Sequence, residues 1–220
     1  MEGTGESFPH LVAKCSQSYQ IWLHLGTMAS LSDERIPPVF TLAEARALGH
    51  SERQVYAWRD NGDIEVLGHG IYARPGIEMD HDLIEISVRA PEATLCLTSG
   101  LARHDLIDDI PSAIDLALPR EYRQPRTGAP ARWHRFDAST FSVDRTQIEV
   151  GAGRTLGLYG PRRCIIDAFR LRHLYGNDQA VGALRRWLKL RGSQPAELLT
   201  LAGLFPVVER PLREALEILL

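Results

Sequence analysis

The sequence predicts an α+β protein in which a winged helix-turn-helix at residues 37–76 precedes a mixed α/β domain at residues 77–220 that ends in helices. Three observations predict this class. Two capped helical segments are separated by a tight turn, a glycine-bracketed hairpin follows them, and strand and helix patterns then alternate to the end of the chain. Residues 1–36 are a weakly specified extension.

The composition is that of an ordinary globular protein, with 44% hydrophobic and 24% charged residues among 220. No apolar run approaches the roughly 18 residues of a membrane span, and residues 1–10 lack the basic and then apolar pattern of a signal peptide. We therefore expect a cytoplasmic protein without a membrane partner. Cys15, Cys96 and Cys164 share no CxxC spacing, so the sequence predicts neither a disulfide framework nor a zinc cluster. We expect no metal site and no cofactor.

The first elements are helical. Residues 20–31 have the spacing of one helix, although an N-cap is missing, and Pro37-Pro38 ends that segment. A capping box at residues 41–44 opens a short helix through Leu48, which Gly49 ends. A second capping box at residues 51–54 opens a helix to about Asn61. The short turn between these two helices predicts a steep crossing, as in a helix-turn-helix.

A β-hairpin follows the second helix. Apolar residues alternate in residues 64–67 and 71–73 on either side of Gly68-His69-Gly70, and Pro75-Gly76 closes the segment. Helix, turn, helix and hairpin together predict a winged helix.

The second helix has a core face and an outward face. Val55, Trp58 and Gly62 fall on one side at helical spacing, and the outward side chains are those that reach base edges in a helix-turn-helix. Arg53 suits guanine and Gln54 suits adenine, while Ser51 suits a phosphate. The candidate DNA contacts in this module are Ser51, Arg53, Gln54, Tyr56, Ala57, His69 and Arg74.

Structural roles compete with these assignments. Ser51 is also a helix cap, Tyr56 also suits packing against the hairpin, and Gly68 and Gly70 suit the turn whatever the function. Residues 37–76 also carry four arginines against five acidic residues, which is a poor balance for a surface that neutralises phosphates.

The charge of the chain is uneven. Residues 77–119 hold two basic and nine acidic side chains, whereas residues 120–191 hold fifteen basic and six acidic ones, for a net charge of +9. The basic block is either a solvated surface paired with the acidic block or a second contact for a polyanion. The candidate anion or DNA contacts there are Arg120, Arg123, Arg126, Arg162 and Arg163.

The second domain mixes both kinds of element. Hydrophobic spacing favours a helix at residues 82–89, with a strand left open, and a helix at residues 93–104. Strands are expected at residues 113–118, 133–136, 147–150 and 154–159, with a loop at 122–130 and a hairpin turn at 151–153. Later helices are expected from Pro161 with Leu174 on the apolar face, from an Asp178 cap through Arg191, and over residues 193–204 and 211–219.

One cluster resembles a catalytic site. His104 lies near Asp108 and Asp109, but no metal-binding or phosphate-loop spacing accompanies these residues. We expect a helix end followed by an acidic turn, and no enzyme, and an enzyme that uses these three residues stays the minority hypothesis.

The sequence also resembles a known family. In the first module the similar residues are Val39–Thr41, 43–45, Gly49, Ser51, 54–56, Gly62 and 67–72; in the second domain they are 94–101, 110–111, 116–120, 159–167 and 183–188. These stretches resemble AbiEi-type antitoxins of type IV toxin-antitoxin systems, and the resemblance covers the chain from about residue 38 to its end.

This resemblance implies a DNA-binding autorepressor that recognises operator repeats in double-stranded DNA upstream of its own operon. It also implies that the second domain helps to bind DNA and to neutralise a nucleotidyltransferase-like toxin. The chain departs from the family at His69, where an arginine is frequent, and carries Glu52 and Asp60 on the recognition helix. Two other hypotheses stay open: a protein-interaction module without DNA binding, and a stand-alone regulator without a toxin. We expect two copies, monomeric or dimeric in solution, to pair on the repeat.

Overall fold

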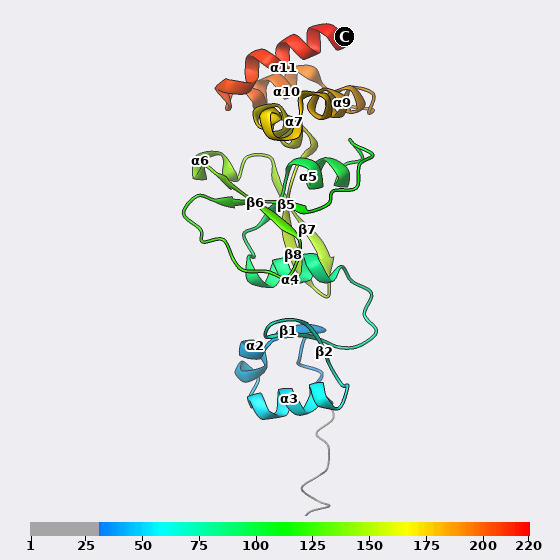
Figure 1. Cartoon of the computed structure of the whole chain (residues 1–220), viewed down its shortest axis with the longest axis vertical. Coiled ribbons are helices and arrows are strands. Elements are labelled where there is room, and N and C mark those ends of the chain that lie inside the picture. The colour runs from blue at the N-terminus through cyan, green and yellow to red at the C-terminus, as the bar shows by residue number, and fades with distance from the viewer. Residues whose placement is uncertain (1–30) are drawn as a thin grey trace, which may run out of the picture. The chain divides into compact units, whose positions relative to one another are not determined.

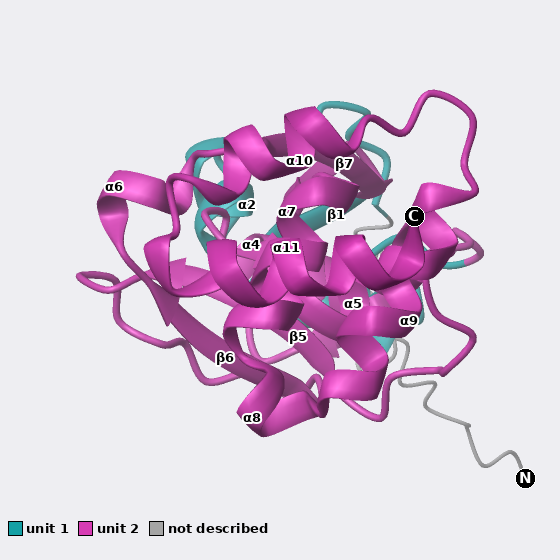
Figure 2. Ribbon diagram, turned by 90° about the horizontal axis from the view of Figure 1, so that it is seen from above, with its two compact units in different colours: residues 1–66, 72–75 teal, residues 67–71, 76–220 magenta. Residues whose placement is uncertain are grey.

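The computed structural model describes residues 31–220, which divide into two compact units (Figures 1 and 2). The first unit extends to Val66 and includes Tyr72–Pro75, and the second unit comprises Leu67–Ile71 and Gly76–Leu220. The helix expected at residues 20–31 lies outside the described residues, apart from its last position.

The first unit combines two helices with a small sheet. Its elements are β1 (Val39–Thr41), α2 (Leu42–Ala47), α3 (Glu52–Asp60) and the outer parts of the hairpin strands β2 (Glu65–Gly68) and β3 (Ile71–Ala73), whose residues next to the turn are counted with the second unit. The strands are ordered β1-β3-β2, so the predicted hairpin is present and β1 extends it. Sequence analysis did not predict β1, because three residues beside a proline pair form a strand only when a distant strand supplies the hydrogen bonds.

The core of the first unit lies between the helices and the sheet. Val55 and Trp58 from α3 pack with Phe40 of β1 and Tyr72 of β3, and all four side chains are buried. In Figure 1, α3 and the strands lie on opposite sides of this unit. The outward face of α3 therefore points away from the sheet.

The second unit contains a five-stranded sheet. Its elements are α4 (His81–Arg89), β4 (Thr94–Leu95), α5 (Leu97–Arg103), β5 (Ile114–Pro119), β6 (Ala131–Phe136), α6 (Ala138–Phe141), β7 (Arg145–Gly151), β8 (Arg154–Tyr159), α7 (Pro161–Arg170), α8 (Arg172–Tyr175), α9 (Asn177–Leu188), α10 (Pro195–Ala202) and α11 (Pro206–Leu219). The strand order is β6-β5-β4-β8-β7. The β4–β8 and β5–β6 pairs are parallel, and the β4–β5 and β7–β8 pairs are antiparallel.

Helices cover both faces of this sheet. In Figure 1, α4 lies along one side, and α5, α7 and α9 to α11 lie on the other. The larger core fills the second side: Leu101, Ile165, Leu184 and Leu212, one from each of four helices, are buried in it with Phe136 of β6. The expected α+β class is confirmed.

Most predicted elements of the second unit are present, and four details were wrong. The helix expected at residues 93–104 begins only at Leu97, because Thr94 and Leu95 pair with both β5 and β8 in the middle of the sheet. Asp178 lies inside the first turn of α9, and Gly176 with a positive φ of 89° precedes that helix without a side-chain cap. Helix α11 begins at Pro206, so Pro211 lies within it.

Leu174 is a fourth correction. The chain leaves α7 at Leu171 and forms the separate turn α8, so Leu174 lies outside the apolar face of α7 and is exposed.

Candidate nucleic-acid interface

The helices α2 and α3 are fixed at their ends by the two predicted capping boxes. Thr41 Oγ1 accepts from the Glu44 N–H at 3.2 Å, and the Glu44 carboxylate accepts from the Thr41 N–H at 2.6 Å. In α3 the Ser51 hydroxyl accepts from the Gln54 N–H at 3.3 Å, and Gln54 Oε1 accepts from the Ser51 N–H at 2.8 Å. These reciprocal bonds satisfy backbone donors that a helix start otherwise leaves unpaired.

The turn between α2 and α3 requires a glycine and is braced by a histidine. Gly49 has a φ of +95°, which side-chain-bearing residues rarely adopt. The His50 ring bonds to Asp33 Oδ2 through Nε2 at 2.9 Å and packs edge-on to Trp58 at 4.9 Å between ring centroids. The turn is therefore fixed against the core of the first unit, and it holds the N-terminus of α3 in place.

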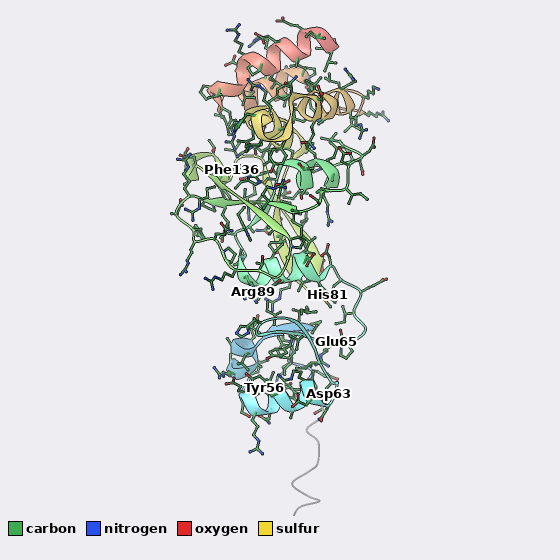
Figure 3. All side chains as sticks on the ribbon, in the orientation of Figure 1. Tyr56, Asp63, Glu65, His81, Arg89 and Phe136 are labelled. Carbon is green, nitrogen blue, oxygen red and sulfur yellow. The ribbon has the colours of Figure 1, made fainter. Side chains whose placement is uncertain are left out.

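Ion pairs occupy much of the exposed face around α3. Arg46 of α2 bonds to the Glu52 carboxylate, and Arg59 pairs with Asp60 at 2.8 Å. Tyr56, which is labelled on α3 in Figure 3, donates its hydroxyl to Glu52. The Arg59 guanidinium lies over the Tyr56 ring at 4.9 Å from the centroid. The Tyr56 hydrogen bond, with Arg46 beside it, holds the pKa of Glu52 below its ordinary range. Glu52 therefore stays ionised at neutral pH and fixes the position of the Tyr56 ring.

Arg53 is the cation of α3 that these pairs leave free. Its side chain is exposed, and it has no hydrogen bond or ion pair among residues 31–220. Ala57, the other outward residue predicted as a contact, is half-buried. The structure thus presents one free guanidinium on the helix face where base contacts were predicted.

Gln54 and Ser51 are less available than the sequence suggested. Gln54 Oε1 accepts from both the backbone N–H and the hydroxyl of Ser51, the latter at 3.0 Å. Bidentate recognition of adenine needs the amide oxygen as well as the amide nitrogen. Gln54 can therefore donate from its amide nitrogen, but using its oxygen would break the cap of α3.

Arg74 has a structural role. Its Nη2 donates to the carbonyls of Asp33 at 2.8 Å and Ile36 at 3.3 Å, and its side chain is half-buried. The guanidinium ties the segment before β1 to the end of β3. This occupied position removes Arg74 from the candidate DNA contacts.

His69 lies in the hairpin turn that belongs to the second unit. Its carbonyl accepts from Arg89 Nη2 at 3.0 Å, and a Cβ on the preceding Gly68 would lie 3.0 Å from Glu85 Oε1. The turn is therefore held against α4 by its backbone, whereas the His69 side chain is exposed. His69 remains a candidate contact.

Of the predicted arginines in the second unit, three lie on the loop between β5 and β6. Arg120, Arg123 and Arg126 are exposed. The end of this loop is anchored because Glu85 Oε2 accepts from the N–H groups of Gly128 at 2.9 Å and Ala129 at 3.1 Å. The loop is therefore a basic surface held at its C-terminal end by a buried carboxylate.

The other two predicted arginines are engaged by partners within the second unit, Arg162 in a half-buried position and Arg163 in the core. Arg162 pairs with Glu197 at 2.6 Å and with Asp144 at 3.7 Å. Arg163 is fully buried, donates to Asp167 at 2.9 Å and lies 4.3 Å from the centroid of the Tyr159 ring. The buried position removes Arg163 from the candidate surface contacts.

The residues of the enzyme hypothesis do not converge. His104 Nε2 contacts the Tyr159 carbonyl at 2.7 Å, Asp108 pairs with Arg186, and Asp109 is exposed without a partner in the described chain. Among residues 31–220, no three His, Cys, Asp or Glu side chains are grouped so that they could hold a metal ion. The free thiols of Cys96 and Cys164 are buried, and burial raises their pKa well above the ordinary value, which makes them poor nucleophiles.

Sequence reasoning missed a buried polar cluster. Asp115 Oδ1 accepts from the Tyr175 hydroxyl at 2.6 Å and bonds to His134 Nε2 at 2.9 Å. Burial, with the hydrogen bond to Asp115, raises the pKa of Tyr175 far above its ordinary value. Position 115 follows an apolar residue in a strand pattern, so an acidic residue in that buried strand was the available signal.

Comparison with known proteins identifies the class of the first segment. Residues 31–75 match a family model of transcriptional regulators. That family is described as "Transcriptional regulator, AbiEi antitoxin", so the resemblance to AbiEi-type proteins is confirmed over these residues. No curated protein matches the chain significantly. Among residues 31–220, every helix falls short of the length and hydrophobicity that a membrane span requires.

Proposed function

We propose that this chain is a sequence-specific DNA-binding repressor, without catalytic activity, that acts on operator repeats upstream of its own gene. The observation that carries the proposal is the unpaired Arg53 on the outward face of the capped helix α3, within the segment that matches the regulator family. In this role the first unit acts as a winged helix-turn-helix, with α3 in the major groove.

In this proposal, Arg53 and the residues around it each make a different contact with DNA. Arg53 donates both arms of its guanidinium to guanine O6 and N7, and the Gln54 amide nitrogen donates to a neighbouring base. Tyr56, held by Glu52 and Arg59, places an aromatic ring against a thymine methyl or a sugar.

The second unit adds phosphate contacts. Arg120, Arg123 and Arg126 supply positive charge that the first module lacks. Phosphate contacts fix position and raise affinity without reading sequence. We therefore assign specificity to α3 and a large part of the affinity to the loop between β5 and β6.

Arg53 variants test this proposal. We expect the full chain to bind the DNA upstream of its gene more tightly than a shuffled duplex, as measured by fluorescence anisotropy at two salt concentrations. Arg53→Ala should weaken specific binding by about 10- to 100-fold, because a bidentate base contact contributes about 1–3 kcal/mol. Arg53→Lys keeps the charge but loses the bidentate geometry. Compared with Arg53→Ala, it should restore nonspecific binding but not the preference for the upstream DNA.

The matched control is Arg191→Ala, which removes another exposed arginine, one that lies in the second unit. This variant should leave the preference for the upstream DNA unchanged. Equal binding of both duplexes by the wild-type chain would overturn the proposal.

A protein-docking module is the second candidate function. The pairs Arg46–Glu52 and Arg59–Asp60 neutralise much of the face around α3, which suits a protein partner better than a polyanion. Under this alternative, Arg53→Ala leaves regulation of the upstream promoter intact in a reporter assay.

We also propose that the chain is the antitoxin of a nucleotidyltransferase-like toxin, since the matched family consists of antitoxins. Cells that express a neighbouring nucleotidyltransferase-like gene should stop growing, and co-expression of this chain should restore growth. Failure of rescue together with specific DNA binding would leave a stand-alone regulator.

A further inference from the structure

We propose that α9 is a self-association surface, through which two copies of this chain pair antiparallel about Gly182. The partner is a second copy of the same chain. The inference rests on the second unit alone and does not depend on DNA binding.

The outward face of α9 has a glycine at its middle. Ala180, Leu184 and Trp187 are buried against the core, and helical spacing places Gly182 on the opposite side. A Cβ at position 182 would meet nothing within 4 Å. Glycine is unfavourable inside a helix compared with alanine, and no contact within the described chain requires it. A second backbone that approaches the helix closely would require it.

The surface beside Gly182 is hollow. A cavity of about 310 Å³ lies between α9 and the turn after α5, and its lining includes Gly182, Gln179 and Asp109. Ile110, the next residue, is 94% exposed, which is unusual for a large aliphatic side chain. A helix of a second copy laid over Gly182 would fill this hollow and cover Ile110.

The charges on α9 would complement those on a second, antiparallel copy of the same helix. Asp178 lies four residues before Gly182 and Arg185 three residues after it, and both side chains are exposed without a partner in the described chain. A two-fold axis at Gly182 brings Asp178 of each copy toward Arg185 of the other, so that the pair forms twice. A parallel arrangement would instead set like charges together. The antiparallel arrangement also sets the helix dipoles in opposite directions.

Charge reversal in the full-length chain tests the pairing by sedimentation velocity. We expect the wild-type protein at about 100 µM to sediment at twice its 24.6 kDa mass, as an interface with a micromolar Kd would. Asp178→Arg and Arg185→Asp should each raise the dissociation constant at least about tenfold, because like charges then meet across the axis. Arg123→Asp, a charge reversal on the exposed loop, is the control and should leave the dimer intact.

Mixing the two single variants separates the interface from the fold. An equimolar mixture of Asp178→Arg and Arg185→Asp chains should form a heterodimer, since every contact then joins opposite charges. Gly182→Ala should also weaken the dimer, while circular dichroism at a dilution where the chain is monomeric shows an undiminished thermal midpoint. A wild-type monomer at 100 µM, or a mixture that stays monomeric, would overturn the proposal.

Discussion

Single side chains in this protein take roles that follow from their partners more than from their chemistry. Arg53, Arg74 and Arg163 were all candidate contacts in the sequence, with the strongest claim at Arg53. The structure leaves Arg53 exposed, uses Arg74 to bind two carbonyls, and buries Arg163 beside Asp167. A guanidinium in water can meet a phosphate, whereas a buried guanidinium must bond inside the protein because burying an unpaired charge is costly.

Asp33 shows the same effect of partners on an acidic residue. Its carboxylate accepts from the Arg35 side chain at 2.6 and 3.0 Å, from the Arg35 N–H at 2.9 Å, and bonds to His50 at 2.9 Å. These bonds, with the Arg35 guanidinium first, hold the pKa of Asp33 well below its ordinary range. The turn before α3 therefore depends on an ionised carboxylate.

We expect the contribution of Asp33 to stability to disappear in acid. Because the pKa is lower in the folded than in the unfolded chain, the stabilisation is fully present above the ordinary aspartate pKa. It is lost as the pH falls through the lower folded value. Asp33→Asn should lower the thermal midpoint at pH 7, and its difference from wild type should shrink progressively below the ordinary aspartate pKa, as measured by circular dichroism.

The control for this experiment is Glu34→Gln, a neighbouring exposed carboxyl group without a partner in the described chain. It should change the midpoint little at either pH. A constant difference between Asp33→Asn and wild type across the acid range would contradict the assignment.

The packing of helices in the second unit depends on how closely their backbones can approach each other. Helices α5 and α7 pack against each other, and Gly100 of α5 lies over Cys164 of α7. A Cβ at position 100 would lie 2.5 Å from the Cys164 Sγ atom, which is shorter than any normal contact. The glycine is required by packing, whereas Gly182 of α9 faces open space.

Gly100→Ala should therefore destabilise the protein although alanine favours helices. We expect a loss of about 1–3 kcal/mol in the free energy of unfolding by urea titration, as for overpacked cores. Cys164→Ala removes the obstructing sulfur. The double variant should therefore lose less free energy of unfolding than the two single variants lose together. If the two single losses add up to the loss of the double variant, the strain at Gly100→Ala does not come from the Cys164 sulfur.

Charge is distributed unevenly over the whole molecule: the first module is nearly neutral, and the second unit has a basic surface. Residues 120–191 carry a net charge of +9, but Arg163 and Arg170 bind Asp167 and Arg162 binds Glu197. Arg123 and Arg126, on the loop before β6, are exposed without a partner in the described chain. Several arginines of this block are therefore engaged in ion pairs, whereas Arg123 and Arg126 leave two unpaired guanidinium groups close together on one loop.

Removing Arg123 and Arg126 together should change how DNA binding depends on salt. If both contact phosphates, the double alanine variant should reduce the slope of log affinity against log salt by about 1.8, at about 0.9 per contact. The preference for the upstream DNA should persist, because phosphate contacts carry no sequence information.

The matched control changes Arg210 and Arg213 to alanine in α11, where each pairs with a glutamate four residues away. Its salt dependence should equal that of the wild-type chain. An unchanged slope in the Arg123 and Arg126 variant would show that the loop does not touch DNA.

The sequence by itself determined the local features of the first unit. The capping boxes of α2 and α3 were predicted because their bonds join residues only three apart, and the turn at Gly49 was predicted because a glycine ends the first helix there. The outward position of Arg53 follows from the same helical spacing.

Only the tertiary structure decided features that depend on distant partners. Strand β4 replaced the start of a predicted helix because β5 and β8 flank it. Arg163 entered the core because the carbonyls of Thr140 and Val143, 23 and 20 residues away, accept from its guanidinium beside the local pair with Asp167. Local sequence encodes hydrogen bonds within one turn of chain. Which arginine meets solvent and which meets buried backbone carbonyls is set by residues far along the chain, whose positions exist only in the folded protein.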